Sequence, residues 1–551
     1  MPTSTSPAVM TDSAIVSRRT IGAGCVLLLL LLGPLFVCMP LNSDTALFDL
    51  QAERVLQGGV LYRDIVEPNL PGVVWIHLAV RPLVGWSSEA IRAVDLLIFA
   101  GIIFLAMRML RGHRAGALFA FSATMFYLCC NEWCHCQRDT WMLLPAVSAL
   151  LLRLRSGTVE PRRLQFAVLE GSLWGCAFWI KPHVAVPALI VIAVDTMLRQ
   201  NRSGVIKDIA AVIAGGILAA LPGIWWLIDS GAWPHFWEMM LEWNPEYLEA
   251  GRERQSPERW WMMIYRFHPW WIVHIVAVPL AWQAIRVAIT VRDNIACDRT
   301  VSLVAAIYAG WLLQALILQH AMDYIHAPPI VLGLLLISSW PWQLDMAPRR
   351  VATGVFLCLA LLAAPILNLQ RLAMWPGCWS EGSSMPIRAT LAHGTFPAWQ
   401  QLSKVVDYLR EQRVKDGELT CLNVHSVHVF RELRVQPATR YWCTLILQDL
   451  FKHRAAGIDA AVRRNTSRFI VTESLESGLT NDDSPNDFPW NRPVVFEAGT
   501  YKIHATNVLQ PGPEDGQPLP IRSSDSDVQT ELPNPTLPRT AIHDDVSSKS
   551  I

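Results

Sequence analysis

Long apolar runs recur along the first two-thirds of the sequence, and they constrain the fold more than any other feature. A helix needs roughly 20 apolar residues to cross the hydrocarbon core of a bilayer, and most of these runs approach that length. Hydrophobic residues make up 52% of the 551 residues, which is too apolar for an ordinary soluble enzyme. We therefore expect an α-helical polytopic membrane protein with about 11 transmembrane helices. The runs lie near residues 21–41, 93–107, 115–130, 140–152, 164–180, 184–198, 209–228, 270–288, 301–319, 326–341 and 351–369.

The positive charges in the loops predict the orientation. Lys plus Arg and Asp plus Glu both number 46, so the net charge gives no reason to expect a nucleic-acid partner. Arg and Lys are more frequent in the loops on the side of Arg18 and Arg19 than in the longer loops on the other side. Cytoplasmic loops carry this excess, so we expect the N-terminus in the cytoplasm. An odd number of spans then places the C-terminal region outside the cytoplasmic membrane.

The sequence divides into a membrane part and a C-terminal part. The first apolar run lacks a small-residue cleavage site, which indicates an uncleaved anchor. After the last run, helical and strand patterns alternate, which predicts a small extracytoplasmic α/β domain. The predicted organisation is a cytoplasmic tail at 1–19, a transmembrane domain at 20–371 with a first outer loop at 42–92, a linker at 372–394, the α/β domain at 395–510 and a disordered tail at 511–551.

The first outer loop opens with an acidic stretch. An ionised Asp costs about 2.5–3.5 kcal/mol at the bilayer centre, so this stretch lies at or outside the membrane face. Apolar residues recur at helical spacing between Thr45 and Leu56, and Gly58 follows as a helix breaker. We interpret the stretch as a short helix on the membrane, with a catalytic acid, Asp44, at its start and with Asp49 solvating the helix. An acidic connecting loop is the alternative interpretation.

This loop resembles the first outer loop of the C-type glycosyltransferases, in particular their protein O-mannosyltransferase-like, bacterial integral-membrane branch. The resemblance lies in D-T-A-L-F, A-E-R-V-L-Q-G-G-V-L-Y-R-D and P-N-L-P-G, and it extends over nearly all of residues 20–345. It implies the C-type fold and transfer of a sugar from a polyprenyl-phosphate carrier. In that family an Asp-Glu pair often opens this loop. Here Thr45 follows Asp44, so only the Asp carries over.

The same resemblance implies the other site residues. Asp44 is the expected general base. The motif Q-R-D-T-W-M-L-L-P makes Asp139 a second catalytic acid that positions the acceptor or a metal, and Arg138 a phosphate ligand. Lys181 and His183, in K-P-H, are expected at the carrier phosphate. The remaining expected substrate-binding residues are Arg63, Asp64, Gln319, Tyr324 and His326.

Most of these side chains also have a structural interpretation. Arg138 and Asp139 fit a helix cap, and Lys181 fits a side chain that reaches toward the interface from an apolar helix. Gln319, Tyr324 and His326 fit a polar gap between helices.

Two further segments have distinctive compositions. The acidic, Trp-rich loop at 229–268 indicates helices lying in the membrane interface. The cysteines at Cys130, Cys134 and Cys136 flank His135 at spacings that suit a zinc site poorly, so we assign no metal and leave a disulfide open.

The combined prediction is an inverting glycosyltransferase that moves a hexose or pentose to a lipid, glycan or protein acceptor at the outer face of the membrane. No organic cofactor is expected, and a divalent cation is left open. One alternative is a lipid or sugar transporter or flippase, although transporters place ionisable residues near the midplane and these carboxylates cluster at one face. The other alternative is a non-catalytic sugar-lipid receptor, because the second acid is missing at Thr45.

Overall fold

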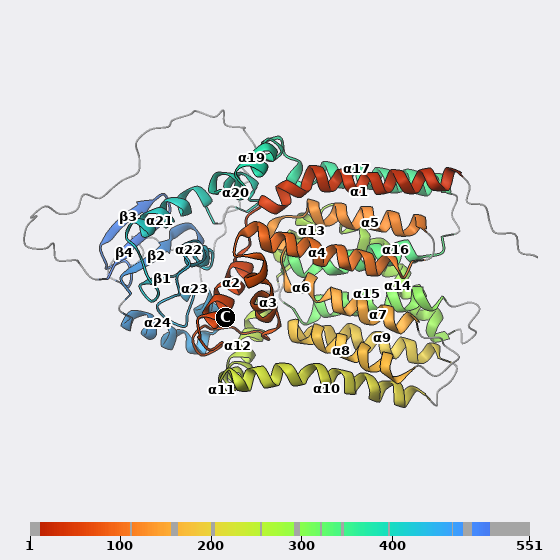
Figure 1. Cartoon of the computed structure of the whole chain (residues 1–551), viewed down its shortest axis with the longest axis horizontal. Helices are drawn as coiled ribbons and strands as arrows, with labels where there is room; N and C mark the ends of the chain where they lie inside the picture. The colour runs from red at the N-terminus through yellow and green to blue at the C-terminus, as the bar shows by residue number, and fades with distance from the viewer. Residues whose placement is uncertain are drawn as a thin grey trace, which may run out of the picture.

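Every apolar run that the sequence places in the membrane is helical in the structure. The helices lie side by side with their axes in one general direction (Figure 1). They are α1 (Asp12–Cys38), α4 (Ser88–Met107), α5 (His113–Cys129), α7 (Leu143–Arg155), α8 (Leu164–Ile180), α9 (Ala185–Leu198), α10 (Val205–Asp229), α14 (Ile272–Thr290), α15 (Arg299–Ile317), α16 (Ala327–Ser339) and α17 (Met346–Leu362). The structure is a computed structural model that describes residues 12–110, 113–155, 163–199, 204–253, 256–290, 298–319, 322–342, 346–394, 397–465, 467–477 and 487–506.

The bundle is that of a multi-pass membrane protein. Large apolar side chains on its outside are exposed, among them Leu30, Leu97, Ile213 and Trp282, which suits lipid rather than water. Among the described helices, four are long and apolar enough to cross a membrane alone, namely α4, α10, α14 and α15. Helix α1 and the next helix, α2 (Ser43–Leu56), form a bent pair at 62° that adds a fifth span if they are taken together. The other apolar helices are shorter, so the count of about 11 spans stays a prediction.

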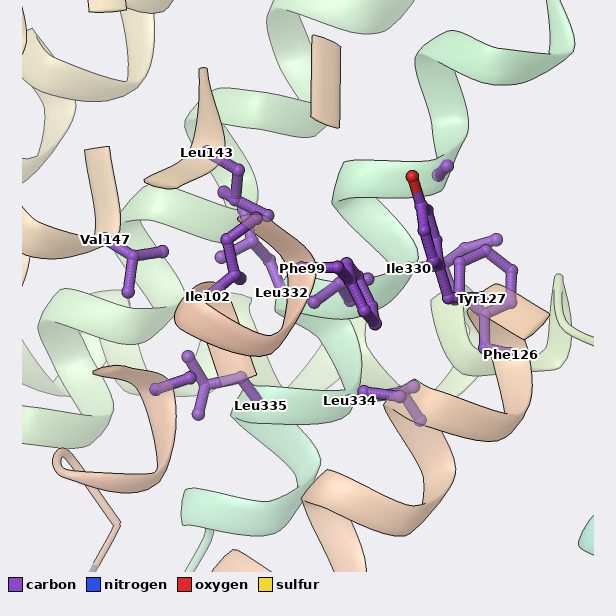
Figure 2. Packing of buried hydrophobic residues seen from close by; sticks show 14 of the residues in the cluster. Phe99, Ile102, Phe126, Tyr127, Leu143, Val147, Ile330, Leu332, Leu334 and Leu335 are labelled. Carbon is purple, nitrogen blue, oxygen red and sulfur yellow. The ribbon is translucent and has the colours of Figure 1, made fainter. Parts of the chain in front are cut away.

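The core of the bundle lies where α4, α5, α7 and α16 meet (Figure 2). The rings of Phe99 and Tyr127 stack there, with their centroids 3.9 Å apart. Helices α8 and α10 approach even more closely, because Gly171 has no side chain to separate them. A Cβ at Gly171 would lie 1.9 Å from the carbonyl oxygen of Val212. Apolar packing of this density holds the helix ends, and hence the loops between them, in fixed positions.

One end of the bundle is closed by buried ion pairs. Arg153 donates to Glu170 at 2.7 Å and to Asp195 at 2.7 Å. Arg299 donates to the other oxygen of Asp195 at 2.7 Å, and Asp208 lies 3.5 Å from Arg153. These residues tie α7, α8, α9, α10 and α15 together, so their charges serve packing rather than a site.

The opposite end carries a layer of shorter helices between the bundle and the sheet (Figure 1). This layer contains α2, α3 (Gly72–Val84), α11 (Trp233–Glu238) and α12 (Asn244–Glu253). Helix α2 begins close to where its sequence pattern begins. However, nearly all of its residues from Ser43 to Ala52 are buried by protein, so α2 is not the surface helix that we expected. The sequence patterns did not indicate α3.

The C-terminal part folds as the predicted small α/β domain. Its strands are β1 (Leu419–Cys421), β2 (Phe469–Glu473), β3 (Val494–Ala498) and β4 (Tyr501–Ala505), in the sheet order β1-β2-β4-β3. Strand β1 pairs parallel to β2, with Thr420 opposite Ile470, and the other pairs are antiparallel. The helices around the sheet are α21 (Trp399–Glu411), α22 (Val427–Leu433), α23 (Thr444–Leu450) and α24 (Ala455–Arg464).

The boundaries of this domain differ in detail from the sequence pattern. The stretch interpreted as a linker contains two short helices, α19 (Trp375–Ser380) and α20 (Met385–Leu391). The first of them packs on α1, where the Trp375 indole donates to the carbonyl oxygen of Leu30 at 3.3 Å. The predicted tail at 511–551 and residues 1–11 lie outside the described residues.

The acidic loop after α10 binds the C-terminal domain. Glu238 pairs with Arg440 at 3.2 Å, and Glu253 pairs with Lys452 at 2.5 Å. Between them, Arg454 pairs with Glu246 at 3.4 Å. The acids of this loop, which we expected among membrane-interface helices, therefore dock α11 and α12 onto the neighbouring domain.

Candidate functional site

Asp44 lies in the first turn of α2, where the helix dipole favours a negative charge. Asn42 caps this helix, because its Oδ1 accepts from the backbone N–H of Thr45 at 2.8 Å. Gln137, in the segment between α5 and α7, donates through Nε2 to Asp44 Oδ2 at 3.2 Å. The cap and the amide together fix the direction of the Asp44 carboxyl.

Three distant segments meet beside Asp44. Lys181 follows the last residue of α8, and its Nζ donates to both oxygens of Asp139, at 2.8 and 2.9 Å. Asp139 lies on α6 (Arg138–Trp141). The same Nζ donates to Gln319, just beyond α15. The electrostatic interactions of Asp44 with Lys181 and Asp139 place these groups in one site.

A close backbone contact brings the first outer loop to this place. Gly72 begins α3 against the end of α8, and a Cβ there would lie 2.4 Å from the carbonyl oxygen of Trp179. Any larger residue would push α3, and the loop before it, away from Lys181. Glycine at position 72 is therefore a requirement of the site geometry.

Arg138 supplies a buried cation. Its side chain interacts with Tyr247 of α12, with Tyr324 and with Asp139. Burial lowers the pKa of the Arg138 guanidinium, but these neighbours outweigh burial and raise it above its usual value. Its Nη1 is buried and has no hydrogen-bond partner among the described residues. An unmade hydrogen bond to a buried charged group is costly, which is typical of a place that an anionic ligand occupies.

Burial moves the two main titrating groups toward neutrality. It raises the pKa of the Asp44 carboxyl above 3.8, and the charge of Arg138 and the hydrogen bond from Gln137 only partly offset this. Burial also lowers the pKa of the Lys181 ammonium to about 8, despite the opposite charge of Asp139. Asp44 thus accepts a proton more readily than an exposed Asp, and Lys181 is a cation below about pH 8.

The two predicted histidines are neutral at ordinary pH. Burial, together with the charge of Lys181, lowers the pKa of His183 to about 4. Burial lowers the pKa of His326 to about 4 as well, and the His326 ring lies 6.1 Å from that of Trp260. Both therefore offer a neutral ring to a ligand rather than a positive charge.

Arg63 and Asp64 are not brought into the site. Arg63 donates to Asp64 at 2.8 Å, and the Arg63 side chain is 52% exposed. The hydrogen bond from Arg63 lowers the pKa of Asp64 to about 2. In the described part of the chain, neither side chain is hydrogen-bonded or ion-paired to Asp44, Asp139 or Lys181.

The side chains present do not suit a divalent cation. Both oxygens of Asp139 accept from Lys181, and no three His, Cys, Asp or Glu side chains of the described chain gather as metal ligands. Among the described residues, Cys130, Cys134 and Cys136 form no disulfide. His135 lies between them in the sequence, and its Nε2 is hydrogen-bonded to the carbonyl oxygen of Tyr127 at 2.8 Å. This cluster is therefore part of the core.

The environment of Asp49 differs from the solvent-exposed one that we expected. It is buried rather than solvating the helix, and it accepts from His77 at 2.8 Å, Arg81 Nε at 2.6 Å and Arg431 at 2.9 Å. Burial by itself would raise the pKa of Asp49, but the hydrogen bond from His77 and the charge of Arg431 hold it well below its usual range. Asp49 joins α2 to α3 and to α22 of the C-terminal domain.

Comparison with known proteins matches the fold but not the sequence. No family model matches the chain, and no curated protein does. The structure of ArnT from Cupriavidus metallidurans bound to undecaprenyl phosphate matches with a TM-score of 0.57 at 14% identity, over 92% of this chain and 100% of that one. Its apo structure matches with a TM-score of 0.56 at 14% identity, over 90% and 98%. The chain has the fold of the C-type glycosyltransferases.

A third match is more distant. An oligosaccharyltransferase from Archaeoglobus fulgidus, tethered to an acceptor peptide, aligns with a TM-score of 0.44 at 10% identity, over 83% of this chain and 69% of that one. This similarity is too weak to carry an argument.

Within this C-type fold, sequence patterns missed several residues of the site. Gln137 stood inside the quoted motif, yet nothing marked it as the partner of Asp44. Tyr247 reaches Arg138 from α12, and the sequence indicated only that this segment forms helices at the membrane interface. Glu67, which the sequence analysis did not single out, is buried and accepts from Gln51 at 2.7 Å. Only contacts across the fold reveal these roles.

Proposed function

We propose that this protein transfers a sugar from a polyprenyl-phosphate donor to an acceptor at the outer face of the cytoplasmic membrane. The observation that carries the proposal is Arg138, a buried cation with an unsatisfied N–H group beside a carboxyl, Asp44, whose pKa burial raises. A phosphate oxygen satisfies that N–H, and ArnT, which shares the fold, is a protein seen with undecaprenyl phosphate bound.

The residues divide the chemistry between them. Asp44 accepts the proton of the acceptor hydroxyl as the oxygen attacks the anomeric carbon. The bond from that carbon to the phosphate oxygen breaks, and Arg138 and Lys181 stabilise the phosphate that leaves. Asp139 is neutralised by Lys181 and is not available as a nucleophile. A single displacement follows, and it inverts the anomeric carbon of a hexose or pentose.

The test is transfer by purified protein in proteoliposomes. Radiolabelled polyprenyl-phosphate sugars are supplied on the outside together with an extract of membrane lipids, glycans and proteins as acceptors. We expect the label to move to an acceptor and an equal amount of polyprenyl phosphate to be released. If intact labelled donor instead appears in the inner leaflet, the protein is a flippase and the proposal is wrong. If the donor binds and nothing is released with any sugar in the panel, the protein is a receptor.

A further inference from the structure

The start of α2 is held by two other segments through three consecutive residues. Asn42 Nδ2 donates to the carbonyl oxygen of His135 at 2.9 Å, and Asp44 accepts from Gln137. Both of these partners belong to the segment of the membrane part between α5 and α7. The residue between them, Ser43, is bonded instead to the C-terminal domain: its Oγ lies 2.7 Å from His425 Nδ1. The residue before Asp44 is thus hydrogen-bonded across a separation of 382 positions.

His425 is itself held firmly by the sheet. It lies on a short 3-10 turn, η6 (Val424–Ser426), which directly follows Asn423. Asn423 donates to the carbonyl oxygen of Glu473 at 2.9 Å and accepts from its N–H at 2.8 Å, which pins the turn to the end of β2. The His425 ring also lies 5.5 Å from that of Trp133, edge to face. A rigid chain of contacts therefore runs from the sheet to Ser43.

His425 does not change its charge where the enzyme works. Burial lowers the pKa of His425 to about 4, so the ring is neutral at ordinary pH and the bond to Ser43 is kept. The neighbouring histidine, His428, is equally buried and lines the same small cavity between the domain and α2. Neither ring nitrogen of His428 has a hydrogen-bond partner among the described residues. Of these two histidines, His425 alone holds Ser43.

From this arrangement we propose that His425 of the C-terminal domain is a positioning residue for Asp44, acting through the Ser43 hydroxyl. It fixes the start of α2 so that the Asp44 carboxyl stays partly buried and directed at the acceptor. The proposal rests on the proposed function, because it concerns the geometry of the proposed base. It also assigns the C-terminal domain a part in the reaction.

The primary test compares His425→Ala, Ser43→Ala and the double variant in the transfer assay. We expect each single variant to lower kcat about five- to tenfold, as the loss of one hydrogen bond at about 1 kcal/mol implies, with both KM values little changed. The double variant should be no slower than either single one, since all three remove the same interaction. A better solvated Asp44 has a lower pKa, so the acid limb of kcat/KM should move to lower pH.

Two variants serve as controls. His425→Asn places an amide near the position of Nδ1 and should restore most of kcat, which general damage to the domain would not allow. His428→Ala deletes an equally buried imidazole three residues away and should leave kcat and the pH profile unchanged. If His425→Ala keeps wild-type kcat, or if His428→Ala matches its loss, the proposal is wrong.

A second readout separates this proposal from the proposed function. Hydrogen exchange of the amides at the start of α2 reports its order whether or not the protein transfers sugar. We expect faster exchange at Thr45–Asp49 in His425→Ala and no change in His428→Ala. Unchanged exchange overturns the positioning role even if the enzyme is active. A wild-type protein that transfers no sugar, together with the expected change in exchange, overturns the proposed function alone.

Discussion

At the scale of single residues, the candidate site contains two carboxyls, Asp44 and Asp139, that differ in their hydrogen-bond partners. In the described part of the chain, both oxygens of Asp139 accept from Lys181, whereas Asp44 accepts a single side-chain hydrogen bond, from the neutral amide of Gln137. The charge of Asp139 is thus compensated directly by Lys181, whereas Asp44 has no direct ion pair among the described residues. The sequence offered both as catalytic acids, and the geometry favours Asp44 as the base.

Asp44→Asn tests this choice. The amide keeps the shape of the side chain but accepts no proton, so we expect kcat to fall at least a hundredfold, within the range of about 10²–10⁴ that general-base catalysis supplies. Donor binding should be nearly normal. The matched control is Glu53→Gln, which removes one charge from the far end of the same helix, where Glu53 pairs with the exposed Arg434. If Asp44→Asn keeps more than about a tenth of kcat, Asp44 is not the base.

The pKa of Lys181 predicts how kcat/KM changes at alkaline pH. Its pKa of about 8 means that the cation, and with it the affinity for phosphate, is present below that pH and is lost above it. We expect kcat/KM to fall above about pH 8 in the wild type. In Lys181→Arg the charge persists, so this limb should disappear even if overall activity is lower. A limb that persists in the Arg variant assigns the titration to another group. Lys181→Ala should weaken donor binding and leave the acceptor KM nearly unchanged.

At the scale of elements, α2 was predictable in part. The spacing of apolar residues such as Leu47 and Leu50 is a local signal, and it indicated a helix here. What covers α2 was not predictable, because its neighbours α3 and α22 come from elsewhere. The ion pair of Asp49 with Arg431 spans 382 positions, and no pattern near Asp49 points to it. Local sequence therefore placed the candidate base on a helix but not the helix within the molecule.

Asp49→Asn should destabilise the protein rather than alter the chemistry. Breaking one partner of a buried ion pair costs about 3–5 kcal/mol, because charges such as Arg81 and Arg431 are left buried and uncompensated. We expect a clear loss in the thermal midpoint of the detergent-solubilised protein, with Glu53→Gln nearly unchanged. Since the pKa of Asp49 is lowered by folding, its stabilising effect is present above the ordinary Asp pKa and is lost as the pH falls below it. An Asp49→Asn variant as stable as wild type contradicts this role.

At the scale of the whole molecule, composition and periodicity were sufficient for the membrane bundle and the small α/β domain. They could not foresee how the two parts join. From the sequence, we interpreted the acids of α11 and α12 as part of an interfacial segment. Their partners, Arg440, Lys452 and Arg454, lie some 200 positions later, so nothing near these acids indicates the ion pairs. In Figure 1 the sheet lies beyond the layer of shorter helices, and these ion pairs join the two.

The predicted orientation places the sheet outside the cell, because the loop charges put the N-terminus inside. Alkaline phosphatase folds only outside the cytoplasm, so a fusion after residue 505 should be active. A fusion after Arg163, in a loop predicted to be cytoplasmic, should be inactive and serves as the control. The reverse pattern contradicts both the topology and the assignment of Asp44 to the outer face.

The ion pair between Asp49 and Arg431 has a consequence for biogenesis. Helix α2 leaves the ribosome long before the segment that holds Arg431 and His425 is made. During that interval the start of α2 lacks the hydrogen bond between Ser43 and His425, and Asp49 lacks the positive charge of Arg431. A chain truncated before His425 should therefore show faster hydrogen exchange at the start of α2 than the full chain.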